Sequence, residues 1–147
     1  MRLVLQRVSQ ASVSVDDQTV GSIGRGYVIL LCVMKGDTSL HAQWLAEKLV
    51  KLRLFESHEG KVNDRSLLDI GGEVLVVSQF TLAGDIAKGN RPDYMAAAGP
   101  DEAKILYEYF MKKLQELRVH KVEGGVFGAM MSVQLTNDGP VTLILEK

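Results

Sequence analysis

The chain has 147 residues, a length that suits one domain with a single hydrophobic core. Hydrophobic residues make up 46% and charged residues 24%, as in ordinary globular proteins, and a net charge of -1 gives no general attraction to nucleic acid or anionic lipid. No apolar run approaches the length of a membrane span, and the N-terminus alternates like a strand rather than a signal peptide, so we expect a cytosolic protein.

The first third of the sequence predicts strands. Residues 3–8 and 11–15 alternate apolar and polar side chains, and residues 19–23 can return as a hairpin partner after an Asp-Asp turn. Arg7 departs from the apolar pattern of its face, and the local pattern leaves open whether it points to solvent. The nearly continuous apolar run at 27–34 predicts a strand that is buried on both faces.

Two helices follow from apolar periodicity and from residues typical of helix starts. The first has Asp37 or Thr38 as a credible N-cap and apolar residues at three- and four-residue steps. The second opens at Pro100, with acidic residues at the positive end of the helix dipole. Its predicted apolar stripe consists of Ile105, Leu106, Tyr109, Phe110, Leu114 and Leu117.

The remaining strands are predicted at 73–80, 119–123, 129–135 and 141–145, with a long irregular segment over 83–99. The tally is about eight strands, mostly in antiparallel runs, and two long helices packed on one side. This pattern predicts a single α+β domain over residues 1–147 with a curved, barrel-like, mostly antiparallel sheet. Because sheet edges must be covered, dimerisation through the sheet is plausible.

The stretch Asn137–Thr142 lies between the last two predicted strands. Gly139 tolerates backbone angles that other residues avoid, and Pro140 lacks an N–H, so this stretch presents bare carbonyls in a rigid arrangement. Local sequence favours a plain hairpin turn. A cis Gly139–Pro140 bond would instead indicate a specialised feature, because only about 5–6% of X-Pro bonds in folded proteins are cis.

Motifs for a specific chemistry are scarce. The histidines at 41, 58 and 120 are scattered without metal-ligand spacing, and no phosphate-binding glycine loop or Gly-x-Ser-x-Gly elbow is present. The single cysteine, Cys32, lies in an apolar run and is predicted to be a buried, inert thiol. Ser78 and Thr81 could act as nucleophiles only with a neighbouring base, which the sequence does not reveal. We therefore expect no metal and no cofactor, and the residues alone name no reaction.

The sequence resembles the D-aminoacyl-tRNA deacylases (D-tyrosyl-tRNA deacylases) from end to end. Two shared motifs, Ser-Gln-Phe-Thr and Asn-Asp-Gly-Pro-Val-Thr, are far apart in the sequence and together are highly specific. The matching segments are Gln6-Arg7-Val8, Ala11-Ser12-Val13, Val77–Leu82, Lys88–Pro92, Phe127-Gly128-Ala129 and Asn137–Thr142.

This resemblance implies a homodimer with active sites at the subunit interface and D-aminoacyl-tRNA as the substrate. It implies that Gly139-Pro140 is a cis dipeptide that reaches into the partner's pocket and binds the substrate's α-ammonium through two carbonyls. An L-side chain would then clash with the Gly-Pro backbone, whereas D-aminoacyl and achiral glycyl esters would fit.

The resemblance also assigns roles to other residues. Ser78, Gln79, Phe80 and Thr81 would form the catalytic wall, where a backbone N–H around Phe80 holds the ester carbonyl. Met131 and Ala97 match positions that line the adenosine end of the pocket, and Arg7 matches a residue that fixes the Gly-Pro segment. Lys88 and Arg91 are candidates for tRNA phosphate contacts.

Three mechanisms remain open at this point. In the preferred one, the 2′-hydroxyl of the terminal adenosine assists attack by water, which fits the lack of a visible side-chain base. In the second, Thr81 is the nucleophile of a conventional esterase. In the third, the protein is a non-catalytic dimeric module that retains tRNA without releasing the amino acid.

Overall fold

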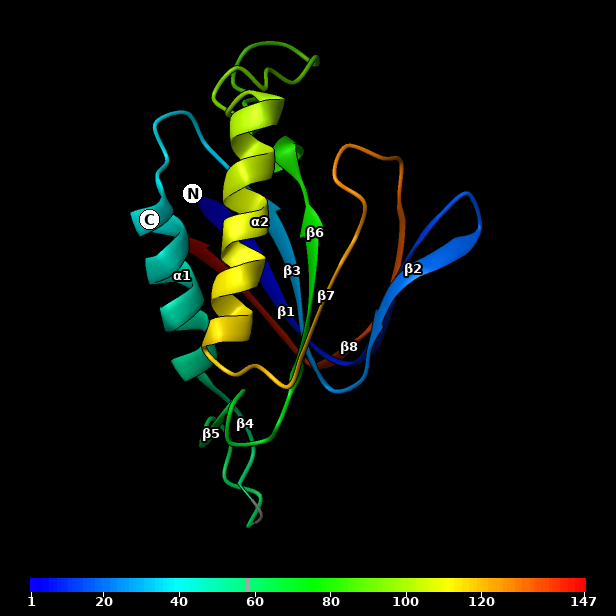
Figure 1. Ribbon diagram of the computed structural model, residues 1–147, viewed down its shortest axis with the longest axis vertical. Coiled ribbons are helices and arrows are strands. Elements are labelled where there is room, and N and C mark those ends of the chain that lie inside the picture. The colour runs from blue at the N-terminus through cyan, green and yellow to red at the C-terminus, as the bar shows by residue number, and fades with distance from the viewer. Residues whose placement is uncertain (58) are drawn as a thin grey trace.

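The computed structural model describes residues 1–57 and 59–147. Six strands form one sheet in the order β2-β1-β3-β6-β7, with β8 paired to β1, and β4 pairs separately with β5. Two helices lie side by side over one face of the sheet (Figure 1). In chain order the elements are β1 (Arg2–Val15), β2 (Gln18–Ile23), β3 (Gly26–Cys32), α1 (Ser39–Lys51), β4 (Arg53–Phe55), β5 (Arg65–Ser66), β6 (Glu73–Ser78), the 3-10 turn η1 (Phe80–Ala83), α2 (Pro100–Glu116), β7 (Lys121–Gly124) and β8 (Ser132–Glu146).

The strand β1 is the centre of the sheet. It runs without interruption through the two segments that we predicted as separate strands, and it pairs antiparallel with β2, β3 and β8. Lys121 of β7 donates to the carbonyl of Ser22 in β2 at 2.7 Å, which brings the two far edges of the sheet together. The predicted curved, barrel-like and mostly antiparallel α+β domain is therefore confirmed.

Two strand pairs, β3–β6 and β6–β7, are parallel, which the sequence analysis did not predict. Parallel neighbours need crossover connections, and α1 and α2 lie in those two crossovers. Each helix therefore starts near the end of the sheet where β3 and β6 terminate. Figure 1 shows the end of β6, the turn η1 and the start of α2 at this same end of the molecule.

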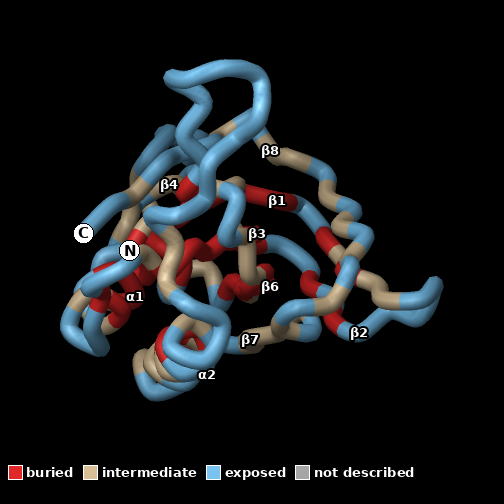
Figure 2. Tube along the Cα trace, turned by 90° about the horizontal axis from the view of Figure 1, so that it is seen from above, coloured by how far each residue is buried: buried red, intermediate tan, exposed pale blue. Residues whose placement is uncertain are grey.

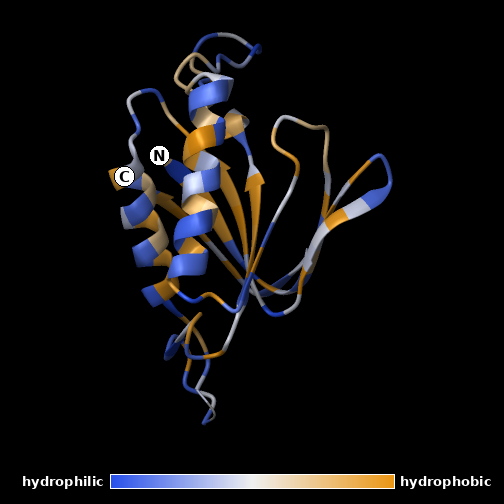
Figure 3. Cartoon of the chain, viewed as in Figure 1, coloured by the Kyte–Doolittle hydropathy of each residue, from blue (hydrophilic) through white to orange (hydrophobic). Residues whose placement is uncertain are grey.

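The hydrophobic side chains of β3 and β6 divide between two cores. Ile29 and Val76 pack toward the helices against residues such as Leu45 and Phe110, whereas Leu75 packs into a second cluster within the curve of the sheet. Figure 2 shows the buried residues concentrated in the central strands and along the inner sides of the helices, and Figure 3 shows the matching apolar stripes. The prediction of a strand buried on both faces is thus confirmed for β3.

The predicted stripe of the second helix is confirmed at Leu106, Phe110 and Leu114, which are buried, and at Tyr109 and Leu117, which pack partly buried against the core. Ile105 is 67% exposed, whereas Tyr107, which the stripe omitted, is buried together with Leu106, Phe110 and Leu114. Tyr107 lies three residues before Phe110 and seven before Leu114, so helical spacing alone could have identified it. Among the described residues, no helix is long and apolar enough to cross a membrane.

The hairpin predicted around Gly139-Pro140 is wrong. Both flanking segments belong to the single strand β8, and both pair with β1. Gln6 pairs with Thr142 and Val8 pairs with Asn137, so residues 138–141 bulge out opposite the single residue Arg7. Within the described chain, β8 pairs with no strand except β1, which leaves its other edge free of a ladder partner.

Candidate active site

An apolar pocket of about 400 Å³ opens at the end of the sheet where β3 and β6 terminate. Ligand sites in sheets with helical crossovers often lie beyond the carboxyl ends of parallel strands. The segment Ser78–Phe80 forms one wall, Ala97 and neighbouring residues form another, and Phe127 lies on the remaining side. The structure therefore brings Ala97 beside the consecutive residues Ser78, Gln79 and Phe80, although Ala97 comes much later in the sequence.

The turn η1 starts directly after β6 and presents backbone donors beside this pocket. Gln79 N–H donates to Leu31 of β3 at 2.8 Å, and the first bond of the turn runs from Leu82 N–H to Gln79. The N–H groups of Phe80 and Thr81 precede that bond and therefore have no partner within the turn. Such an arrangement can hold a developing oxyanion.

The hydroxyl of Thr81 is not activated by a base in this structure. Its oxygen accepts a hydrogen bond from the Gln79 amide Nε2 at 2.5 Å. An amide nitrogen is a donor and cannot remove a proton. This contact orients the hydroxyl without making it more nucleophilic.

Aromatic residues that sequence reasoning missed complete the pocket. Tyr107 lies on α2, donates its hydroxyl to the carbonyl of Val76 at 2.8 Å, and packs its ring 5.7 Å from that of Phe127. Burial raises the pKa of Tyr107 to about 12, so its phenol stays neutral and structural at physiological pH. At the mouth, Tyr94 meets Phe80 edge to face, with ring centroids 5.2 Å apart.

The bulge at residues 138–141 is a second candidate part of the site. Its Gly139–Pro140 peptide is cis, and Gly139 has a φ of 114°, which a glycine adopts readily. At its base the Asn137 amide donates to the Thr142 hydroxyl at 3.1 Å and joins the two ends. The motif residues Asn137 and Thr142 therefore close the bulge, while Gly139 and Pro140 lie exposed at its outer side.

Arg7 lies beneath this bulge and is only 8% exposed, so it does not point to solvent. Its Nε donates to the Asp138 carbonyl at 3.1 Å, and its Nη1 donates to the Leu54 carbonyl of β4. The guanidinium also lies 3.3 Å from the Asp138 carboxylate and 5.9 Å from the centre of the Phe55 ring. Arg7 therefore ties the bulge to a second, separate segment of the chain.

The bulge and the pocket of one chain lie far apart. Arg7 pairs with Tyr27, which pairs with Val74, whereas Ser78 lies four residues further along β6. Four residues of strand span about 13 Å, and the spacing from β8 across β1 and β3 to β6 adds about 14 Å sideways. The two motifs of one chain are thus on the order of 20 Å apart, too far to contact one substrate ester together.

Other predicted residues lie outside the pocket. Met131 packs against the second core near Val133 and is not among the residues lining the pocket. Lys88 and Arg91 lie exposed on the long loop before α2. Among the described residues no cluster of histidine, cysteine, aspartate or glutamate could hold a metal ion, and His58 lies outside those residues.

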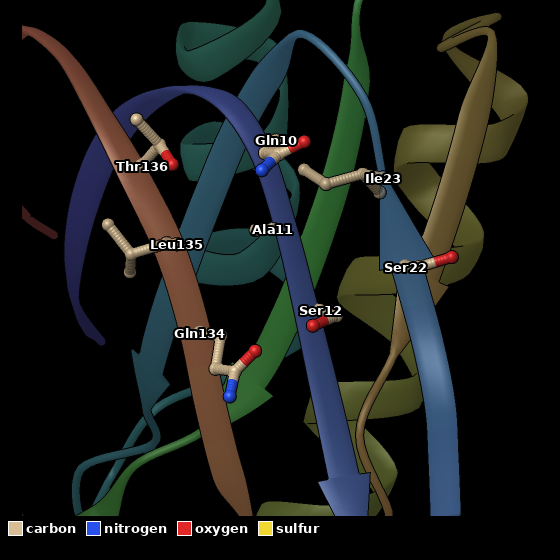
Figure 4. A pocket seen from close by; sticks show the side chains of 8 residues that line it. All are labelled: Gln10, Ala11, Ser12, Ser22, Ile23, Gln134, Leu135 and Thr136. Atoms are coloured by element: carbon tan, nitrogen blue, oxygen red, sulfur yellow. The ribbon is translucent and has the colours of Figure 1, made fainter.

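A second depression of about 410 Å³ lies on the sheet itself, between β1, β2 and β8. Figure 4 shows its polar side chains, which come from Gln10, Ser12, Ser22, Gln134 and Thr136. A serine needs a neighbouring base to act as a nucleophile, and no residue lining this depression supplies one. The pocket beside Ser78 is therefore the better candidate for chemistry.

Comparison with known proteins shows which family the chain belongs to. Residues 4–146 match the family model described as D-Tyr-tRNA(Tyr) deacylase. The "D-aminoacyl-tRNA deacylase" of Thermus aquaticus is 58% identical over 99% of this chain and 95% of its own length, and that of Halalkalibacterium halodurans is 53% identical over 99% of both.

Solved structures share the fold of this chain. One titled "c-Myc DNA Unwinding Element Binding Protein" has a TM-score of 0.94 and 40% identity, over 100% of this chain and 99% of that one. One titled as a probable eukaryotic D-amino acid tRNA deacylase shares the fold, with a TM-score of 0.84 at 20% identity over 99% and 98% of the two chains. With a family model and relatives that extend over nearly its whole length, the chain belongs to the D-Tyr-tRNA(Tyr) deacylase family.

Proposed function

We propose that this protein is a carboxylic ester hydrolase that cleaves D-aminoacyl-tRNA into free D-amino acid and tRNA in the cytoplasm. The observation that carries the proposal is the match to D-aminoacyl-tRNA deacylases at 53–58% identity over 99% of the chain. The pocket beside Ser78–Phe80 supports it, since an apolar cavity of about 400 Å³ with free N–H groups at its rim suits a nucleoside ester.

In this proposal the ester carbonyl accepts a hydrogen bond from the N–H of Phe80, whose position at the start of η1 leaves it available. That donor stabilises the negative charge that develops on the carbonyl oxygen during attack. The terminal adenosine enters the apolar pocket, with Ala97 on its wall. Lys88 and Arg91 on the exposed loop contact tRNA phosphates.

The attacking group is a water molecule assisted by the 2′-hydroxyl of the terminal adenosine. Two observations on Thr81 support this choice over a threonine nucleophile. Its hydroxyl is hydrogen-bonded to the Gln79 amide, and no residue lining the neighbouring pocket is histidine, lysine, aspartate or glutamate. A nucleophilic hydroxyl needs a general base within hydrogen-bond reach.

The protein acts as a homodimer in which the bulge of one subunit completes the pocket of the other. The separation of the two motifs within one chain, on the order of 20 Å, supports a contribution from a second chain. The sheet also offers a surface for pairing. Ile144 is 69% exposed in a cross-strand row with half-buried Val4 and Leu30, beside the free edge of β8.

Chirality is read by the backbone of this bulge. The carbonyls of Gly139 and Pro140 bind the substrate's α-ammonium while Phe80 N–H holds the ester carbonyl, so only one direction remains for the side chain. A D-side chain points away from the bulge, and an L-side chain meets its backbone. Because glycine has no side chain, mischarged glycyl-tRNA is accepted as well.

The experiment that tests this function is a comparison of D-Tyr-tRNA and L-Tyr-tRNA as substrates. We expect release of D-tyrosine with no release of L-tyrosine above the spontaneous rate. Equal release of both would refute the chirality proposal, and stable binding of tRNA without any release would favour a non-catalytic binding module.

A pair of substitutions isolates the backbone donor. Phe80→Pro removes its N–H at the first position of η1, where proline's fixed φ is tolerated, whereas Phe80→Ala removes the ring and keeps the N–H. We expect kcat to be lower in the proline variant than in the alanine variant by a factor of roughly 10²–10³. Two further changes distinguish a Thr81 nucleophile from water assisted by the 2′-hydroxyl. If Thr81 is the nucleophile, Thr81→Ala abolishes activity, and a substrate with a 2′-deoxy terminal adenosine is still cleaved.

A further inference from the structure

The turn η1 is a single 3-10 turn, and such a turn has too few internal bonds to fix its own direction. Its first residue, Phe80, is 59% exposed, so burial holds only the far end of the turn, at Ala83. The direction of its N–H groups must therefore be set by contacts from neighbouring elements.

Three residues of adjacent strands form one row beside this turn. Arg2 of β1 pairs with Cys32 of β3 on one side and with Glu146 of β8 on the other. Residues that lie directly opposite each other in an antiparallel pair project from the same face of the sheet. The side chains of this Cys32–Arg2–Glu146 row therefore share a face.

Two members of the row bind carbonyls of η1. Arg2 Nη1 donates to the Leu82 carbonyl at 2.6 Å, and the Cys32 Sγ lies 3.5 Å from the Phe80 carbonyl. Glu146 binds the Nε of Arg2 and so holds the guanidinium in place. Burial raises the pKa of Cys32, which keeps its sulfur protonated as a hydrogen-bond donor.

A fixed carbonyl also fixes an N–H. Because the peptide unit is planar and trans, the C=O of one residue and the N–H of the next point in opposite directions. The carbonyl held by Cys32 belongs to the peptide that carries the Thr81 N–H, and the carbonyl held by Arg2 belongs to the peptide of Ala83. Binding the Phe80 carbonyl on the strand side therefore turns the Thr81 N–H away from the strands. The Ala83 N–H instead points to the Cys32 sulfur, so it is not one of the donors at the pocket.

We propose that the Cys32–Arg2–Glu146 row positions the turn η1, and with it the N–H groups of Phe80 and Thr81, with Arg2 as the main residue because it anchors the turn at Leu82. The predicted effect on kcat rests on the proposed function, whereas the predicted effect on the turn itself does not. The contact of a guanidinium with a backbone carbonyl is charge-assisted, whereas a thiol is a weak donor, so Arg2 contributes more than Cys32.

The test compares Arg2→Met with Arg53→Met. Arg53 is a matched control, since it also begins a strand, donates to a backbone carbonyl (Asp64, 2.5 Å) and pairs with a carboxylate, but it lies on β4 away from η1. We expect Arg2→Met to lower kcat about tenfold, with KM unchanged within about twofold. This effect is smaller than that of removing a backbone donor, because the N–H groups remain and are only less well oriented. Arg2→Lys should recover part of the loss, because an ammonium can still bind the Leu82 carbonyl.

Hydrogen exchange gives a readout that does not depend on catalysis. The N–H groups of Leu82 and Gly84 are bonded to Gln79 and Thr81, and their exchange reports on how firmly the turn is held. We expect their exchange to accelerate about tenfold in Arg2→Met and to stay unchanged in Arg53→Met. Unchanged exchange in both variants would overturn the positioning role, even in a protein that proved inactive on D-aminoacyl-tRNA.

Discussion

The buried Arg7 allows the most detailed prediction about this site. Replacing it by methionine keeps much of the apolar stem but removes every donor. Two charge-assisted bonds are lost, to the carbonyls of Asp138 and Leu54, and each is worth about 1.5–3 kcal/mol. The cost of burying the guanidinium disappears too, so we expect a net loss of roughly 2–4 kcal/mol in the free energy of unfolding.

This loss should appear as a fall in melting temperature of about 6–12 °C for a domain of this size. Because Arg7 is the only described side chain shown to bind the bulge backbone at Asp138, we also expect deacylation to fall by more than the folded fraction accounts for. The control is Arg53→Met, whose side chain is 61% exposed and should cost no more than about 1 kcal/mol. An Arg7→Met variant as stable and active as wild type would refute the reasoning.

Three further predictions concern the bulge, the sheet edge and the pocket wall. A methyl group on Gly139 would lie 2.6 Å from a guanidinium nitrogen of Arg7, and the φ of 114° is one that alanine rarely adopts. Gly139→Ala should therefore abolish most turnover. The control Gly99→Ala, with open space around the added methyl group, should leave turnover unchanged. Ile144→Glu should convert the proposed dimer to monomer in light scattering, whereas Ile105→Glu, on the similarly exposed Ile105 of α2, should not. A dimer that persists in both variants argues against this interface. Because the pKa of Tyr107 is raised to about 12 in the folded state, its contribution to stability is fully present below pH 10. As the pH rises from about 10 to 12, the free energy of unfolding of the wild type, measured by urea titration, should fall by about 2 kcal/mol relative to that of Tyr107→Phe. The same pH dependence of stability in both proteins would contradict the burial argument.

Local sequence was sufficient for the elements whose character is set by periodicity. The apolar run of β3, the caps and spacing of both helices and the turn residues after β1 each predict the structure that forms. The predictions that fail are those in which distant pairing decides. Gly-Pro chemistry looks the same in a hairpin and in a bulge, and only the pairing of both flanks with β1 distinguishes them.

The residues of the candidate site were likewise predicted only in part. Ser78, Gln79, Phe80 and Ala97 came from the family resemblance, and the fold gathers them around one pocket. The burial of Arg7 depends on carbonyls far away in the sequence, and no local pattern reports such partners. Tyr107 fits the helical spacing of the buried stripe of α2, but the predicted stripe omitted it.

Mixing two inactive variants tests the central claim, that one subunit completes the pocket of the other, most directly. Gly139→Ala disables the bulge and Phe80→Pro disables the donor, so a heterodimer of the two contains one intact site if the parts come from different subunits. After subunit exchange in equal amounts, we expect about a quarter of the wild-type activity, since half the dimers are mixed and each has one of two sites intact. Activity no higher than that of either variant alone, with exchange confirmed by mass spectrometry, would contradict a shared site.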